Sequence, residues 1–105
     1  LLQLNGHDRF RKRCGDYFTT VQRYEHHTGG FIRRVQSVPA TVHLYSFALK
    51  PEEHQPSGTC NFSRIDNAVL VQTFASDTTK ALRVYAVNYN VLRIMSGMGG
   101  LAYSN

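Results

Sequence analysis

The side chains best suited to acid–base or metal chemistry are histidines and carboxylates, and they form no reactive pattern. His26 and His27 are adjacent. Adjacent residues on a helix point about 100° apart, so this pair does not converge on one metal ion. The run Glu52-Glu53-His54 lacks the second histidine of a zinc-protease helix, and the prolines around it exclude a long helix there. Neither pattern predicts a metal centre.

Nucleophile and phosphate-binding patterns are also incomplete. Ser57 and Ser63 lack the strand–turn–helix context of a nucleophile elbow. Gly97-Met98-Gly99-Gly100 follows a predicted strand, but no Gly-Lys-Ser/Thr ending and no helix follow it. His43 is the only histidine on a predicted strand, too few for an enzyme on a cupin-like jelly-roll scaffold. We therefore predict no catalytic residue, no metal and no cofactor, and a protein that is not an enzyme.

Positive charge gathers near the start of the chain. The net charge is +5, and seven of the 12 Lys and Arg lie in the first 34 residues. Within that stretch Arg11-Lys12-Arg13 is the candidate contact for a polyanion or a partner. No aromatic stacking pattern flanks the run, as a binder of single-stranded nucleic acid would need. A solvated loop or an acidic protein partner is therefore favoured.

The remaining candidate positions concern modification. Cys14 and Cys60 are too few for a disulfide scaffold; one bridge is open to them, but two reduced thiols fit intracellular synthesis better. Asn61-Phe62-Ser63 is an N-glycosylation triplet, which we expect to be unoccupied without a secretory route. No stretch approaches the ~18–20 apolar residues of a membrane helix.

One short helix is predicted. Asp16 is placed to cap it, and Tyr17, Val21 and Tyr24 recur at the i, i+4, i+7 spacing of an apolar helical stripe. Gly29-Gly30 is predicted to end it. A helix of about three turns does not persist alone, so it must pack on a sheet.

Four strands are predicted around this helix, over residues 2–4, 41–49, 68–74 and 82–94. The first ends at Asn5-Gly6, a strong hairpin signal. The second carries apolar residues on both faces, which indicates cover from two sides. The fourth is longer than a usual strand, and Asn88 and Asn90 mark a predicted bulge or bend. The glycine-rich residues 96–100 are predicted to be flexible or tightly turned.

A proline-broken connection joins the second and third strands. Pro51 and Pro56 cannot donate to a sheet ladder, and Ser57-Gly58 signals a turn. In the extended stretch predicted after that turn, Cys60, Phe62 and Arg64 share one face. Arg64 and Asp66 are two residues apart and project together, so they are the candidate structural ion pair or subunit contact. An exposed pair contributes only about 0–1 kcal/mol.

The connection from Pro51 to Ala68 closely resembles a segment of the major capsid proteins of large double-stranded DNA viruses that replicate in the nucleus and cytoplasm, the iridoviruses and their relatives. Three further stretches resemble the same family, in the family's order: residues 2–10, residues 17–28 with their Tyr-Glu-His-His-Thr ending, and residues 85–105. The resemblance covers most of the chain.

The resemblance implies a fold. The family builds a double jelly roll, two eight-stranded sandwiches in one polypeptide, and the matching segments belong to the end of the second. We therefore expect an all-β protein: the C-terminal portion of a jelly-roll β-sandwich with one short helix. Residues 1–105 are expected to form a single partial domain, with no second domain in this chain. Four strands are few for a closed sandwich, so missing partners should come from absent sequence or neighbouring chains.

The resemblance also implies a function: part of a structural major capsid protein whose trimers form pseudo-hexagonal capsomers of an icosahedral shell. Expected partners are copies of itself and minor capsid proteins, with no direct nucleic-acid role. An internal viral membrane lies nearby, but no transmembrane segment is expected. The protein is expected in the virion after synthesis in the host cytoplasm. The alternative is a β-sandwich module that binds glycan or nucleic acid through its basic N-terminal third.

Overall fold

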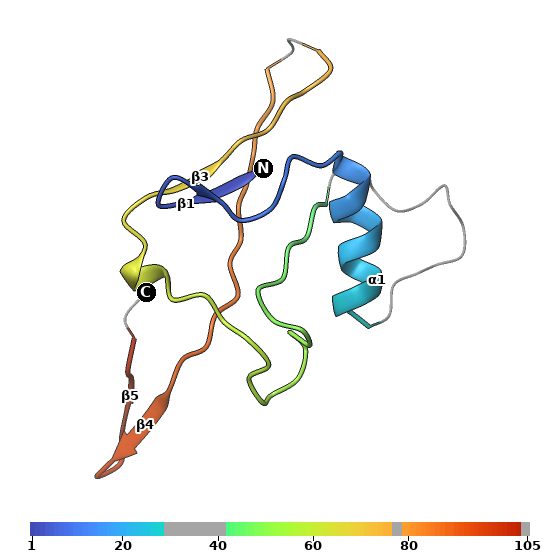
Figure 1. The fold of residues 1–105 in the computed structure, drawn as a ribbon. Coiled ribbons are helices and arrows are strands. Elements are labelled where there is room, and N and C mark those ends of the chain that lie inside the picture. Colours follow the sequence, from blue (N-terminus) through green and yellow to red (C-terminus); the bar gives the residue numbers. More distant parts are fainter. Residues whose placement is uncertain (29–41, 77–78, 104–105) are drawn as a thin grey trace. The chain divides into compact units, whose positions relative to one another are not determined.

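The computed structural model describes residues 1–28, 42–76 and 79–103 (Figure 1). The chain divides into two compact units, Leu1–Thr73 and Phe74–Asn105. The elements, in chain order, are β1 Leu2–Leu4, β2 His7–Asp8, the π-helical turn η1 Tyr17–Val21, α1 Gln22–His26, the 3-10 turn η2 Phe62–Arg64, β3 Ala68–Leu70, β4 Leu92–Met95 and β5 Met98–Leu101.

The first unit contains a small antiparallel sheet in the order β2-β1-β3. The predicted turn between β1 and β2 is confirmed: Asn5 and Gly6 both have positive φ, 52° and 81°, as a two-residue hairpin turn with the right twist requires. β1 then pairs with β3, Leu2 opposite Leu70 and Leu4 opposite Ala68. The two strands lie side by side in Figure 1 although more than sixty residues separate them.

The third strand is shorter than predicted, because its only described ladder partner has three residues. β3 covers Ala68–Leu70, where the sequence predicted a strand to residue 74. Beyond it, the N–H of Val71 donates to the carbonyl oxygen of Leu1 at 2.9 Å, and the terminal ammonium of Leu1 donates back to Val71 at 3.1 Å. Backbone pairing thus continues one residue beyond the two strands, to Leu1 and Val71.

Asn5 ties this hairpin to the start of β3. Its side-chain Oδ1 accepts hydrogen bonds from the backbone N–H groups of Asp66 at 2.9 Å and Asn67 at 3.2 Å. Its own N–H donates to the carbonyl oxygen of Asn67 at 2.8 Å. A single residue thus sets the turn and holds the chain that enters β3.

The predicted helix lies at the expected place but starts differently. The Asp16 side chain does not cap it, since Asp16 already has helical angles (φ −61°, ψ −30°) and its side chain makes no capping hydrogen bond. Instead its carbonyl oxygen accepts from the hydroxyl groups of Thr19 and Thr20. The helix ends at His26, because His27 is extended (φ −123°, ψ 150°). Gly29 and Gly30, the predicted end, lie outside the described residues.

The π-helical turn also changes which face of the helix is buried. A π turn bonds i to i+5, so positions spaced i, i+4, i+7 no longer share one face. Val21 and Tyr24 are accordingly 39% and 77% exposed, and the predicted apolar stripe is wrong. The buried residues are Thr19 and Gln22. The Gln22 amide donates to the Tyr17 hydroxyl at 2.9 Å, and its oxygen accepts from the N–H of Ser46 at 3.3 Å.

Residues 42–49 do not form the predicted strand, and Thr41 lies outside the described residues. No part of 42–49 takes part in a β-ladder. The N–H of Leu44 donates to the carbonyl oxygen of Phe18 at 3.1 Å, and that of Ser46 to Gln22. The segment therefore runs against the helix, which satisfies donors that a neighbouring strand would otherwise pair.

Aromatic rings fill the space between these parts. Ring centroids are 5.4 Å apart for Phe10 and Phe18, 4.9 Å for Phe10 and Tyr45, 5.0 Å for Tyr45 and Phe47, and 5.7 Å for Phe47 and Phe62. These separations and tilted or edge-on orientations are the favourable ones for aromatic pairs. No hydrophobic residue in the described part of the chain is fully buried. This partly exposed aromatic series therefore takes the place of a hydrophobic core in Leu1–Thr73.

The second unit is built on the hairpin β4–β5. The long predicted strand over 82–94 is wrong: of its described residues, only the end belongs to a strand, β4. The glycine-rich stretch forms the turn Ser96-Gly97, with φ of 52° and 76°, and then β5. Asn90 marks no bulge. Its side chain closes the hairpin by accepting from the N–H groups of Val91 and Tyr103 and donating to the Tyr103 carbonyl.

Replacing Asn5 tests how much the hairpin anchor contributes. Asn5→Ala puts alanine, which tolerates the left-handed conformation less well than asparagine, at this turn. It also removes the two hydrogen bonds that the Asn5 side chain accepts, so we expect the free energy of unfolding to fall by about 2 kcal/mol. Asn5→Gly keeps the turn and loses only the contacts, so we expect about half of that loss. Urea unfolding of the full-length protein that contains this chain measures both. Equal stability of the three proteins would show that Asn5 is not an anchor.

Candidate functional site

The histidines and carboxylates of the described residues do not converge. No group of three His, Cys, Asp or Glu within 1–28, 42–76 and 79–103 is placed to hold a metal ion. His26 and His27 point to different partners, as their adjacency predicts: Nδ1 of His26 lies 3.0 Å from the carbonyl oxygen of Leu49, and Nδ1 of His27 lies 3.4 Å from Oε1 of Glu52. The candidate sites are therefore surfaces for contact.

The proline-rich loop is pinned to the end of α1 by Glu52. One carboxylate oxygen of Glu52 accepts from both the N–H and the hydroxyl of Thr28, and the other faces His27. These hydrogen bonds, the Thr28 hydroxyl first and then its N–H, lower the pKa of Glu52 from its ordinary value of 4.5. Within the loop, the N–H of Lys50 donates to Oγ of Ser57 at 2.8 Å. The loop is thus fixed at both its entry and its exit.

The predicted turn at Ser57-Gly58 requires its glycine. Gly58 has φ of 150°, and a β-carbon there would lie 2.9 Å from the carbonyl oxygen of Phe47 and 3.3 Å from Cα of Ala48. The backbone of the loop therefore passes directly against the aromatic segment 42–49. A side chain at this position would push the two segments apart.

The candidate pair Arg64 and Asp66 does not form an ion pair in the described part of the chain. The predicted extended stretch is wrong here, because Phe62–Arg64 is a 3-10 turn whose cap, Asn61, accepts from the N–H of Ser63 at 3.1 Å. Cys60, Phe62 and Arg64 consequently do not share an extended face. The signal in the sequence was Asn61 itself, since asparagine readily bonds the backbone two residues on. A subunit contact at Arg64 and Asp66 stays a prediction.

The basic run lies on the connection between β2 and the helix and lines an open hollow. Arg11, Lys12 and Arg13 are exposed, and the guanidinium carbon of Arg13 lies 4.3 Å from the centroid of the Tyr17 ring. The hollow is completed by Cys14, Asp16, Tyr17, Thr20 and Val21. Sequence reasoning missed Tyr17 here because it was assigned to the apolar stripe; its four-residue spacing from Arg13 was the available signal.

The two cysteines are not joined. Cys14 is exposed and Cys60 is half-buried, and both carry free thiols, the state that the sequence favoured. No described helix has the length and apolar character needed to cross a bilayer.

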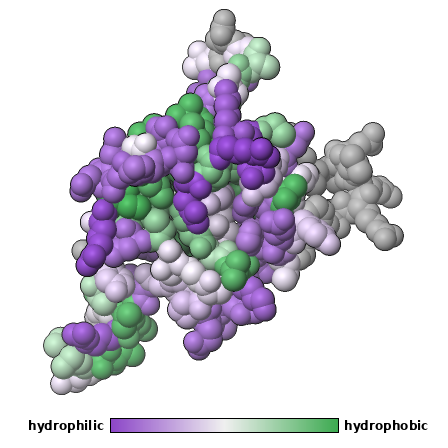
Figure 2. Space-filling view, in the orientation of Figure 1, coloured by the Kyte–Doolittle hydropathy of each residue, from purple (hydrophilic) through white to green (hydrophobic). Residues whose placement is uncertain are grey.

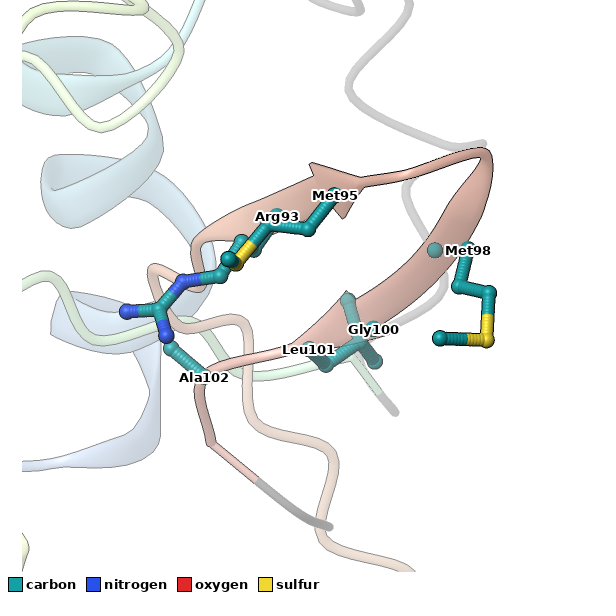
Figure 3. Close-up of a pocket in the computed structure, with 7 residues that line it drawn as sticks. Arg93, Met95, Met98, Gly100, Leu101 and Ala102 are labelled. Carbon is teal, nitrogen blue, oxygen red and sulfur yellow. The ribbon is translucent and has the colours of Figure 1, made fainter.

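The hairpin β4–β5 presents an apolar surface. Arg93, Met95, Met98, Gly99, Gly100, Leu101 and Ala102 line an open hollow along it (Figure 3). Met95 is 62%, Met98 74% and Leu101 64% exposed, and Figure 2 shows hydrophobic side chains gathered over this hairpin beside a hydrophilic group. Arg93 is the only charged residue of the hollow. The composition suits contact with another apolar surface rather than chemistry.

Comparison with known proteins gives a family match along nearly the whole chain. Residues 1–100 match the family described as large eukaryotic DNA virus major capsid protein. The chain is 62% identical to a major capsid protein of Chrysochromulina ericina virus, over 99% of this chain and 18% of that protein. It is 52% identical to the major capsid protein of Paramecium bursaria Chlorella virus 1, over 99% of this chain and 28% of that protein. The chain thus spans only a small part of the length of these relatives.

A solved structure gives the same result for the fold. The VP54 capsid protein of PBCV-1, a crystal structure fitted into a cryo-EM reconstruction of the virophage Sputnik, matches with a TM-score of 0.76 and 49% sequence identity. The match covers 99% of this chain and 29% of that one. The predicted fold class, the end of a jelly-roll capsid protein with one short helix, is confirmed.

Acidification tests the role of Glu52. Its folded pKa is lowered, so its contacts are complete above the ordinary glutamate pKa and are lost as the pH falls through the lowered value. We expect the Thr28 amide to lose protection from hydrogen exchange, corrected for intrinsic rates, as the pH falls below the ordinary glutamate value of 4.5 and through the lowered pKa of Glu52. Glu52→Gln should remove this transition. Glu53→Gln, which breaks only the pair with Lys50, should keep it, and an unchanged transition in Glu52→Gln would contradict the assignment.

Proposed function

The chain belongs to the major capsid protein family of large eukaryotic DNA viruses, and from this premise we propose that the full-length protein assembles as a homotrimer into pseudo-hexagonal capsomers of an icosahedral shell. The observation that carries the proposal is the match to VP54 over 99% of this chain. A second match, at a TM-score of 0.71, is to a quasi-atomic model of the PBCV-1 virus capsid.

The exposed apolar surface supports a role in assembly. Leu92, Ile94 and Met95 of β4 and Met98 and Leu101 of β5 are all more than half exposed. A two-stranded hairpin is at best marginally stable alone in water. Covering this surface, within the full-length protein or against a neighbouring copy, would stabilise it by about 25 cal/mol per Å² of apolar area. Repeated over a closed shell, modest contacts of this kind sum to a stable particle.

The role is structural rather than catalytic. The match to a structural capsid protein family supports this, and Glu52 accepts from Thr28 and faces His27. In this proposal the protein resides in the virion after synthesis in the host cytoplasm. Its partners are other copies and minor capsid proteins, it has no direct nucleic-acid role, and the internal viral membrane lies near it. The two compact units, residues 1–73 and 74–105, are parts of one partial domain.

The alternative, a module that binds glycan or nucleic acid through its basic N-terminal third, is not favoured. The family match includes residues 1–34 as well as the hairpin. The basic third is therefore part of the capsid protein and not a separate binding domain.

Sedimentation tests the proposal. The full-length protein that contains this chain should sediment as a trimer at micromolar concentration. A stable monomer under those conditions would contradict the assembly proposed here.

Ile94→Asp tests whether the hairpin is covered in that protein. If the surface were free, a substitution at this 70% exposed position would change stability by less than about 0.5 kcal/mol. We expect instead that the charge is buried and that recovery of the trimer falls several-fold. Arg83→Gln, at another exposed position of the same unit, is the control and should have no effect. Normal trimer recovery from Ile94→Asp would show that the hairpin does not take part.

A further inference from the structure

We propose that the basic hollow formed by Arg11, Lys12, Arg13 and Tyr17 is a docking site for an acidic segment of a partner protein. The hollow lies on the connection between β2 and the helix, and its three cations are consecutive and exposed. The inference goes beyond the assembly of copies, because it assigns a second kind of contact to a different surface of the chain.

The charge of the hollow is uncompensated. The described ion pairs involve Glu25, Glu52 and Glu53, and none includes Arg11, Lys12 or Arg13. Asp16 is the only acidic residue that lines the hollow, against three basic ones. Three neighbouring cations repel one another, and an anionic partner relieves that repulsion while it gains charge-assisted hydrogen bonds.

Arg13 is already oriented for a carboxylate. Its guanidinium carbon lies over the Tyr17 ring, 4.3 Å from the centroid, and the Tyr17 hydroxyl is held by the amide of the buried Gln22 at 2.9 Å. The cation–π contact restricts the guanidinium, whose N–H donors can still bind a carboxylate. A planar fork held in this way suits bidentate binding of a carboxylate and loses little side-chain entropy on binding.

The shape and chemistry favour a peptide over nucleic acid. A duplex binder neutralises several phosphates along a basic surface, whereas this cluster is one three-residue run. A single-strand binder needs free aromatic faces for base stacking, and Arg13 covers a face of Tyr17. Val21, 39% exposed, adds an apolar margin to the hollow. Carboxylates followed by an apolar residue match this combination.

Most carboxylates of this unit are poorly placed to fill the hollow. In the unit Leu1–Thr73, four acidic side chains already bind other residues of the same unit. The pairs are Asp8 with Gln3, Glu25 with His26, Glu52 with Thr28, and Glu53 with Lys50. A second copy would have to break these contacts to place any of these four side chains in the hollow. A partner that carries its own free carboxylates would not.

The test is a binding titration with the full-length protein. The probe is a fluorescein-labelled hexaglutamate peptide that ends in leucine, followed by fluorescence anisotropy at low and high salt, with the matching hexaglutamine peptide as comparison. We expect binding of the hexaglutamate peptide that weakens with salt, and none of the hexaglutamine peptide. The triple variant Arg11→Gln, Lys12→Gln, Arg13→Gln should lower the affinity by about tenfold.

A charge-matched variant separates the site from net charge. Lys50→Gln, Lys80→Gln and Arg83→Gln together remove three positive charges that do not line the hollow, and this protein should bind the peptide within about twofold of the original. Arg13→Lys keeps the positive charge but replaces the planar guanidinium over Tyr17 with an ammonium group, so it should weaken peptide binding several-fold. This single variant remains informative if the triple variant does not fold. Equal losses in both triple variants, or an unchanged affinity in Arg13→Lys, would overturn the proposal. So would tighter binding of a six-nucleotide single-stranded DNA than of the peptide.

Discussion

Aromatic rings from four separate stretches of sequence touch one another in the unit Leu1–Thr73, and the rest of that unit depends on them. Phe10, Phe18, Tyr45, Phe47 and Phe62 form a continuous series with centroid separations between 4.9 and 5.7 Å. Each such pair is worth about 0.5–1.5 kcal/mol beyond the area it buries. Burial among them raises the pKa of Tyr45. The series places the helix, the segment 42–49 and the proline-rich loop.

The sheets of both units are short. β1 pairs with β2 and β3 over two and three positions, and β4 pairs with β5 over four. Ladders of this length hold a chain in place only when side chains such as Asn5 and Asn90 add bonds at their ends. The apolar side chains of β4 and β5 remain exposed. The chain spans 18% of one related capsid protein, and the proposed function has further surfaces of the full-length protein or of a neighbouring copy cover this hairpin.

Local signals in the sequence predicted what depends on a few neighbouring residues. Asn5-Gly6 gave the hairpin turn, and Ser57-Gly58 gave the close approach to Phe47. Periodicity failed where tertiary bonds compete with it. Phe18 accepts from the N–H of Leu44 and Gln22 from that of Ser46, so no strand forms there. A π turn leaves Val21 and Tyr24 exposed. Cys60, Phe62 and Arg64 share no extended face because Asn61 begins a 3-10 turn there, and Asn61 was the local signal for that turn.

Hydrogen exchange of the hairpin backbone in the assembled full-length protein tests most directly whether this chain works as a covered part of a shell. A four-residue ladder exposed to water opens readily and its amides exchange nearly as fast as those of an unstructured peptide. The account predicts that the amides of β4 and β5, Leu92–Met95 and Met98–Leu101, exchange more than about 100-fold more slowly than that. Exchange at the unstructured rate in the assembled protein would contradict it.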